Sequence, residues 1–160
     1  MAPENLDRVD MAILYLLQTD ARNITTEEIG RRVGLSSSAV ATRIKALEEE
    51  GIVIGYAPVL NYEAAGFENH VLARANSPEE DTDSLVERII ELPNVVSVRE
   101  VIGDRCNLII EVVSETQREI EAVVDELNEL DVAVVDTEML KRERNRVFDT
   151  FGKEYLIDED

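Results

Sequence analysis

The chain has 160 residues, 44% of them hydrophobic and 32% charged, which is enough apolar material for one or two globular domains. It has no run of about 18 apolar residues and no apolar segment near its start, which argues against a transmembrane helix and a signal peptide. The single cysteine, Cys106, excludes an internal disulfide and fits a reducing compartment. We therefore expect a cytoplasmic protein that does not associate with membranes.

The net charge of −19 is unevenly distributed. Residues 1–62 carry a net charge of −3 and residues 63–160 a net charge of −16, and only three of the 16 basic residues are lysines. This balance is typical of proteins that work in molar salt, where charge maintains solubility, so we expect a halophilic archaeal source. Strong screening at that salt would let an acidic protein approach DNA. The alternative is an acidic protein that never contacts nucleic acid.

The first expected element is a helix from Leu6 to about Asp20, with apolar residues at helical spacing. Asp7 caps its start, and Asp10 follows three residues later. This helix can supply the third wall of a small three-helix core.

The stretch from Thr25 to Gly51 predicts two short helices joined by a tight turn. Thr25 and Glu28 have the spacing of a capping box, which opens the first helix. Gly34 ends that helix because glycine adopts a left-handed conformation without strain. Ser36 then caps the second helix, which ends at Gly51.

One side of the second helix is apolar, through Val40, Ile44 and Leu47, and the opposite side is small, hydroxylic and basic. Short hydroxyl side chains allow close approach to a DNA major groove, and basic side chains meet phosphates or guanine edges. A solvated bundle helix could show a similar face, but the complete helix–turn–helix unit favours DNA reading. The candidate DNA-binding residues are Arg31, Arg32, Ser36, Ser37, Ser38, Thr42, Arg43 and Lys45.

Residues 52–60 are rich in β-branched and aromatic side chains, and we expect a strand or ribbon there, in the place of a wing. Pro58 indicates an edge or irregular strand. The expected organisation is a DNA-binding domain over residues 1–60, a linker over 61–67, an effector and oligomerisation domain over 68–145 and a C-terminal extension over 146–160.

The second half predicts a strand–helix–strand–strand–helix–strand order, the βαββαβ pattern of a ferredoxin-like sandwich within an α+β chain. The expected ranges are 69–75, 77–92, 95–102, 106–113, 117–130 and 132–140. The strands are apolar on both faces, and helices can cover only one. A second copy of the chain is the simplest cover, and a two-fold dimer would present two reading helices to two half-sites. The basic run 141–146 could contact nucleic acid, but we favour the alternative that it pairs with the surrounding acidic groups or with a partner subunit.

The stretches LDRVDMAILYLL and EIGRRVGLSSSAVATRIKALEEEGIVIGY resemble the winged helix-turn-helix of the Lrp/AsnC (feast/famine) family of prokaryotic transcriptional regulators. The second half is similar to that family's ligand-binding sandwich. The resemblance implies a sequence-specific regulator that binds double-stranded DNA as a homodimer or larger even-numbered assembly, often under amino-acid control. By position, Ser37, Ser38, Thr42, Arg43 and Lys45 fall on its DNA-contacting helix.

The family's effector sites lie near the turn between the second and third strands, which here contains Gly103, Asp104, Arg105 and Cys106. Gly103 matches the family pattern, but Cys106 stands where an acid is common. Cys106 is either a small buried hydrophobe or a thiol sensor activated by Arg105. One histidine and one cysteine do not make a structural zinc site, and no catalytic constellation is evident. We expect no metal, no cofactor and no enzymatic activity; the rival to a regulator is a small-molecule-binding protein without DNA binding.

Overall fold

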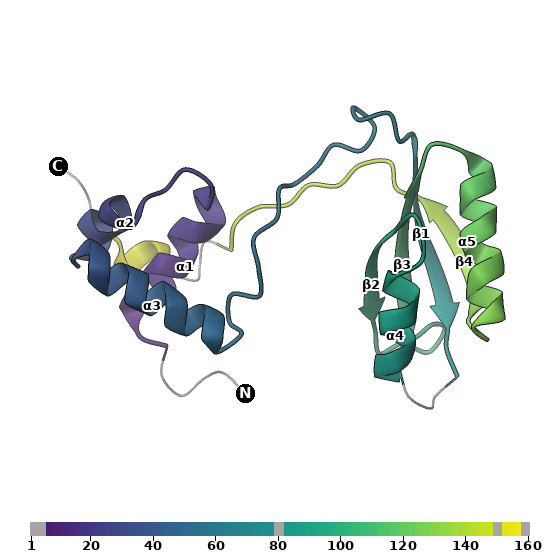
Figure 1. Cartoon of the computed structure of the whole chain (residues 1–160), viewed down its shortest axis with the longest axis horizontal. Coiled ribbons are helices and arrows are strands. Elements are labelled where there is room, and N and C mark those ends of the chain that lie inside the picture. The colour runs from purple at the N-terminus through teal and green to yellow at the C-terminus, as the bar shows by residue number, and fades with distance from the viewer. Residues whose placement is uncertain (1–5, 79–81, 149–151, 158–160) are drawn as a thin grey trace. The chain divides into compact units, whose positions relative to one another are not determined.

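The computed structural model describes residues 6–78, 82–148 and 152–157, which fall into two compact units (Figure 1). Met1–Pro58 and Arg144–Asp160 together form one unit, called here the helical unit. Val59–Glu143 forms the other, called the sheet unit. The C-terminal residues, expected from the sequence to be an extension, therefore pack within the helical unit. Among the described residues, no helix is long and apolar enough to cross a membrane.

The described residues of the helical unit form three α-helices, α1 (Arg8–Asp20), α2 (Thr26–Val33) and α3 (Ser37–Glu49), and the short 3-10 helix η2 (Lys153–Tyr155). Asp7 caps α1, and the side chains of Asp7 and Asp10 bond reciprocally to each other's backbone N–H. Thr25 caps α2 and Ser36 caps α3, each by accepting a backbone N–H three residues later. Gly34 ends α2 at a φ of +75°, the left-handed conformation that the sequence predicted. Each helix of the predicted helix–turn–helix therefore begins at the capping residue expected for it.

The core of this unit lies where the three helices meet. Its largest fully buried side chains are at most 1% exposed, and they come from all three helices. These are Ile13, Leu16, Ile29 and Val40. Burial of each such side chain contributes about 1.5–3 kcal/mol to folding.

No strand forms over residues 52–60, so the expected strand of the wing is wrong in this structure. Ile52 and Val53 still pack against the helical core, but Ile54 is 95% exposed. A strand needs a partner ladder, and the described residues of this unit contain none for it. Gly55, at a φ of +159°, and Pro58 further interrupt extended pairing.

The sheet unit contains the expected βαββαβ order. Its strands are β1 (Asn69–Asn76), β2 (Val95–Glu100), β3 (Leu108–Ser114) and β4 (Ala133–Met139). They form one antiparallel sheet in the order β2-β3-β1-β4, which is the ferredoxin-like arrangement. The helices are α4, described over Thr82–Ile90, and α5 (Gln117–Glu129). The sequence predicted that the first of these helices starts at Ser77 and Pro78, but neither residue is helical, and residues 79–81 lie outside the described part.

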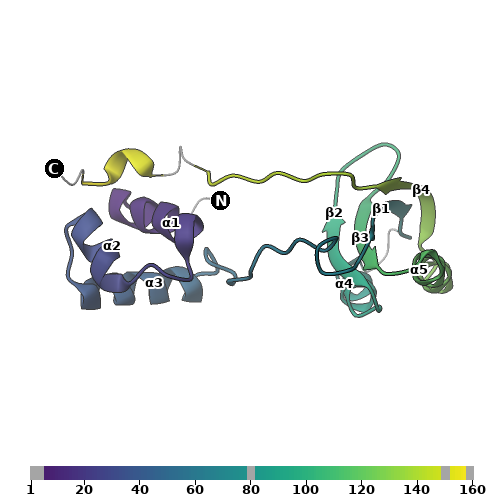
Figure 2. The same ribbon diagram turned by 90° about the horizontal axis from the view of Figure 1, so that it is seen from above.

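Both helices cover the same face of the sheet (Figure 2). Ile89 of α4 and Leu127 of α5 pack against Leu108 and Ile110 of β3, and all four side chains are fully buried. The core of the sheet unit therefore lies between this face and the two helices. It shares no residue with the core of the helical unit.

The opposite face of the sheet is less apolar than the sequence suggested. Glu111, only 8% exposed, accepts a bond from His70 Nε2 at 2.7 Å and one from the Arg99 guanidinium at 3.0 Å. Tyr62 packs edge-on against the His70 ring. Strand alternation places Glu111 between Ile109 and Val113, so an ion cluster interrupts the apolar residues. The expectation of two continuous apolar faces is therefore corrected.

Candidate nucleic-acid interface

The exposed face of α3 carries the short polar side chains that the sequence predicted. Ser36, Ser37, Ser38, Thr42 and Lys45 are all exposed. The Thr42 hydroxyl donates to the Ser38 carbonyl oxygen at 3.0 Å, and the Ser36 and Ser38 hydroxyls lie 3.2 Å apart. The first turn of α3 contains no acidic residue. The positive end of the helix dipole and the hydroxyl groups are thus presented together, an arrangement suited to a phosphate.

The turn before α3 is held closely against α2. The hydroxyls of Thr26 and Ser37 lie 2.6 Å apart and join the starts of the two helices. A Cβ on Gly30 would lie 2.4 Å from the Leu35 carbonyl oxygen, so the α2 backbone touches the turn at that point. Neither contact was predicted from the sequence. Because Gly30 lies inside a helix, where glycine is unfavourable, its presence is the one sequence signal of such close packing.

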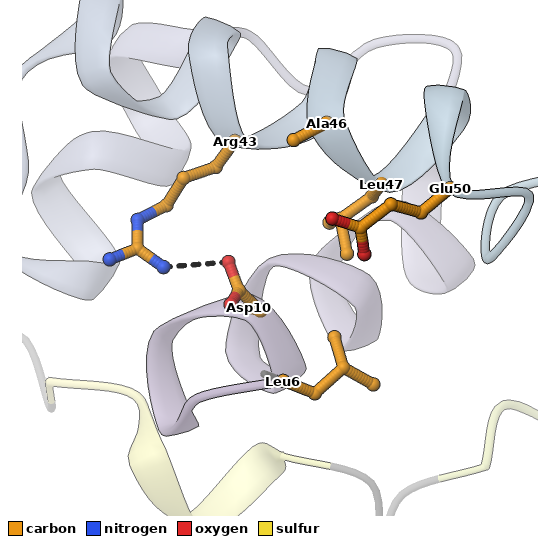
Figure 3. A pocket seen from close by; sticks show the side chains of 6 residues that line it. All are labelled: Leu6, Asp10, Arg43, Ala46, Leu47 and Glu50. Atoms are coloured by element: carbon orange, nitrogen blue, oxygen red, sulfur yellow. Dashed lines mark hydrogen bonds and ion pairs between the residues drawn. The ribbon is translucent and has the colours of Figure 1, made fainter. Parts of the chain in front are cut away.

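Arg43 lies on the side of α3 that faces α1. Its Nη1 donates to Asp10 Oδ1 at 2.7 Å and to Asp7 Oδ2 at 2.8 Å (Figure 3 shows the bond to Asp10). These two hydrogen bonds raise the pKa of Arg43 above its usual value. Desolvation is the largest single influence on Asp7 and raises its pKa, but the bonds from Asp10 N–H and Arg43 together outweigh it, so the pKa of Asp7 is lowered. Arg43 thus joins α3 to the capping residues of α1.

A small pocket lies beside this ion pair, between α1 and α3 (Figure 3). Leu6 and Leu47 form its apolar part, and Asp10, Arg43 and Glu50 its polar part. Asp10 and Arg43 are hydrogen-bonded to each other and therefore do not offer free polar groups to a ligand. We interpret the pocket as imperfect packing between the two helices.

The predicted basic side chains lie on α3 and at the end of α2. Lys45 is 75% exposed and has a loose ion pair with Glu49 at 3.5 Å on the same helix. Arg31 and Arg32 lie in the last turn of α2, where Arg31 is exposed and Arg32 half-buried. The structure therefore gathers Ser36, Ser37, Ser38, Thr42 and Lys45 on the open face of α3 and turns Arg43 toward α1.

The candidate effector residues lie in the loop between β2 and β3. This loop covers residues 101–107 and is longer than the expected tight turn. Gly103, Asp104 and Arg105 are exposed, whereas Cys106 is buried at 8% exposure. A buried thiol is poorly accessible to oxidants.

Asn107, which was not predicted from the sequence, holds this loop in place. Asn107 accepts the Ser77 backbone N–H at 2.9 Å and donates to the Ser77 hydroxyl at 3.0 Å. Asn76 donates to the Arg105 carbonyl oxygen at 3.0 Å. The loop is therefore fixed to the end of β1, with its exposed residues presented outward.

Residues 6–54 match the winged helix-turn-helix DNA-binding family. Over 99 residues the chain is 31% identical to the HTH-type transcriptional regulator Ptr1 of Methanocaldococcus jannaschii, a match that covers 62% of this chain and 66% of that protein. It is 44% identical over 63 residues to the leucine-responsive regulatory protein of Rhizobium meliloti, which covers 39% of this chain and 40% of the relative. The chain thus spans less than two thirds of the length of these curated relatives.

Solved structures extend the similarity to both units. The leucine response regulatory protein LrpA of Mycobacterium tuberculosis is 24% identical, with a TM-score of 0.75 over 89% of this chain and 99% of that one. An AsnC family transcriptional regulator from Agrobacterium tumefaciens is 20% identical, with a TM-score of 0.69 over 89% and 95% of the two chains. These homologues and structural neighbours are regulators and not enzymes. The chain therefore carries a winged helix-turn-helix DNA-binding domain and is a homologue of the Lrp/AsnC-family transcriptional regulators.

Proposed function

We propose that this chain is a sequence-specific transcriptional regulator in which α3 reads the major groove of double-stranded DNA. The observation that carries the proposal is the open face of α3, where short hydroxyl side chains lie at a capped helix start and Lys45 is exposed further along the same helix. Such a face permits close approach to base edges and phosphates. Ser36, Ser37, Ser38, Thr42 and Lys45 would contact DNA directly, with Arg31 and Arg32 beside them. Arg43 would act by positioning α3 against α1.

The test is a selection of binding sites from random duplexes, performed in molar KCl and at about 0.2 M salt. Electrostatic binding weakens as salt rises, so the two conditions separate general affinity from specificity. We expect one enriched motif under both conditions. Lys45→Glu should weaken binding to it at least about tenfold, because a phosphate or base contact becomes a repulsion.

Glu49→Gln is the matched control, since it removes the ion-pair partner of Lys45 on the same helix but no cation. Circular dichroism and sedimentation verify that both variants keep the fold and the assembly state. The proposal fails if no motif is enriched, or if Lys45→Glu binds DNA as well as the parent. A protein that binds small molecules through the sheet unit alone would then be the better description.

The sheet unit would serve assembly and sensing. The face of the sheet away from α4 and α5 still carries the half-buried Leu72 and Ile109 beside its ion cluster, which supports pairing with a second copy into a homodimer or larger even-numbered assembly. Two copies would place two α3 helices on a two-fold operator. Sedimentation equilibrium tests this, and a monomer at micromolar concentration would contradict it.

An amino acid is the proposed effector class, with the loop at Gly103, Asp104 and Arg105 as its site. One structural neighbour, a transcriptional regulator from Neisseria meningitidis, was solved as a complex with L-Met. In the present chain the loop is anchored by Asn107 and presents a carboxylate and a guanidinium, the two charges that an amino acid needs. A thermal-shift screen of the amino acids is the test, because a ligand at 100 times its Kd stabilises by about 2.7 kcal/mol.

Asp104→Ala and Arg105→Ala should abolish the shift, whereas Glu115→Ala, an exposed acid elsewhere in the unit, should not. A redox response through Cys106 is the second candidate. If no amino acid shifts the melting curve but mild oxidant alters DNA affinity, and Cys106→Ser removes that effect, the thiol is the sensor. The burial of Cys106 favours an amino-acid effector over a redox response.

A further inference from the structure

Gly152, near the C-terminus, lies against the backbone of α1. Gly152 is buried, and a Cβ at this position would lie 2.4 Å from both the carbonyl carbon and the oxygen of Met11. Its φ of +141° is also one that other residues rarely adopt. The close approach and the backbone conformation both require glycine. This segment therefore fits one specific place on α1.

Side chains extend this contact along α1. The Arg8 guanidinium lies 5.4 Å from the centre of the Tyr155 ring, within the range of a cation–π interaction. Tyr155 and Leu156 pack against the helical core. At the other end of α1, Gln18 Oε1 accepts the Phe148 N–H at 3.4 Å. The C-terminal residues thus contact α1 from its first turn to its last.

The same segment completes the end of α2. The Ile157 N–H donates to the Arg32 carbonyl oxygen at 2.9 Å. Carbonyls in the last turn of a helix have no partner within the helix, so this bond fills a vacant acceptor. The Ile157 side chain lies beside Gly34, with its Cδ1 3.1 Å from where a Cβ on that glycine would be. Gly34 is the residue at which the chain turns from α2 toward α3, so the C-terminal segment contacts the turn that positions the proposed reading helix.

Two stretches of chain connect the helical unit with the sheet unit. β1 and β4 are antiparallel neighbours, and the Leu140 N–H donates to the His70 carbonyl oxygen at 2.8 Å. The chain therefore enters and leaves the sheet unit at adjacent positions. Because residues on both sides of the sheet unit belong to the helical unit, the sheet unit is an insertion with two covalent connections.

We propose that Phe148 and residues 152–157 are the closing element of the DNA-binding domain, docked on α1 and α2 of their own chain, and that this docking supports DNA reading by bracing the turn at Gly34. A change at the end of β4 then reaches the helix-turn-helix through the C-terminal segment as well as through residues 59–68. The role in DNA reading rests on the proposed function, whereas the docking itself does not.

Gly152→Ala tests the docking in the full-length chain. The matched control is Gly55→Ala, because Gly55 has a comparable φ of +159° but no atom within 4 Å of its would-be Cβ. We expect Gly152→Ala to raise the hydrogen-exchange rate of the Ile157 amide at least about tenfold, since docking is a local opening equilibrium. The melting temperature should fall by about 5 °C, and Gly55→Ala should change neither quantity by as much. Equal exchange rates and melting temperatures in the two variants would overturn the docking.

A chain that ends at Phe148 provides the second test and keeps the basic run 141–146. It should melt like Gly152→Ala, and a peptide of residues 147–160 should restore the melting temperature at about millimolar concentration, the effective concentration that a short tether provides. A truncated chain that melts like the parent would contradict the proposal.

DNA affinity distinguishes the docking from its functional role. Gly152→Ala should bind the selected motif at least about threefold more weakly than Gly55→Ala, in line with a coupling free energy near 1 kcal/mol. Increased exchange with unchanged DNA affinity would overturn the bracing role. If the parent binds no DNA, the proposed function fails, while exchange and melting still decide the docking.

Discussion

Arg43 on α3 is bonded through a single guanidinium nitrogen to Asp10 on α1 at 2.7 Å and, at 2.8 Å, to Asp7, which caps the same helix. Asp10 is itself 88% buried, since its side chain retains 12% exposure. A buried carboxylate without a partner is costly, so this bond ties the orientation of α3 to the start of α1.

Replacing Arg43 by alanine should therefore destabilise the helical unit by about 1–3 kcal/mol, because Asp10 loses its charged partner. Lys45→Ala is the control on the same helix, and its exposed pair with Glu49 should contribute less than about 0.5 kcal/mol. Urea unfolding followed by circular dichroism measures both. Lys45→Ala should nevertheless weaken DNA binding, so the two variants separate stability from reading. Equal stability of both variants would show that the Arg43 bonds contribute nothing.

The pH dependence of stability should contain a contribution from Asp7. Its pKa is lowered in the folded chain, so its stabilising effect is present above the unfolded-state pKa of about 4 and is lost as pH falls through the lower folded value. Asp7→Asn should be less stable than the parent at pH 7, and the difference should shrink below about pH 4. Thermal melts from pH 7 to 2.5 measure this. A difference that stays constant over that range would contradict the assignment.

Gly30→Ala should disrupt the helix–turn–helix, although alanine normally strengthens a helix by about 1 kcal/mol over glycine. The new methyl group would meet the Leu35 carbonyl oxygen at 2.4 Å, and a backbone atom cannot move aside easily. We expect a net loss of at least about 1 kcal/mol, typical of overpacking, with reduced DNA affinity. Gly51→Ala is the comparison, since its φ of +70° adds strain but no atom lies near. Calorimetry measures the stability of both variants. If Gly30→Ala is more stable than the parent chain, the turn packs more loosely against α2 than the structure shows.

Glu111→Ala should destabilise the sheet unit by about 1–3 kcal/mol, because the bonds from both His70 and Arg99 are lost at a buried position. Glu138→Ala is the control: its pair with Arg74, at 3.2 Å, lies at the surface and should contribute at most about 1 kcal/mol. Denaturant midpoints of the two variants give the comparison. If they shift equally, the buried cluster is no stronger than a surface ion pair.

Local chemistry made several elements predictable. Asp7, Thr25, Ser36 and Gly34 begin or end helices through their own backbone or through bonds to residues three positions away, so their roles could be read without the fold. The alternation and spacing of apolar residues similarly predicted the βαββαβ order, now seen in the strand order β2-β3-β1-β4.

The failures concern residues whose partners are distant in sequence. The strand expected at residues 52–60 is missing because strand formation depends on a neighbour that no local pattern specifies. Glu111 looked like one charge among apolar neighbours, and only the pairing of β3 with β1 and β2 brings His70 and Arg99 to it.

Local sequence patterns were enough to predict where the helices of the DNA-binding domain begin and end, and which face of α3 is hydroxylic and basic, since both depend on contacts within about one helical turn. Three placements required the packed chain: Arg43 faces α1, Asn107 anchors the loop between β2 and β3, and Gly152 lies against α1. Each of these depends on atoms dozens of residues apart. Their proximity is a property of the packed chain, because long-range contacts form only when the whole core does.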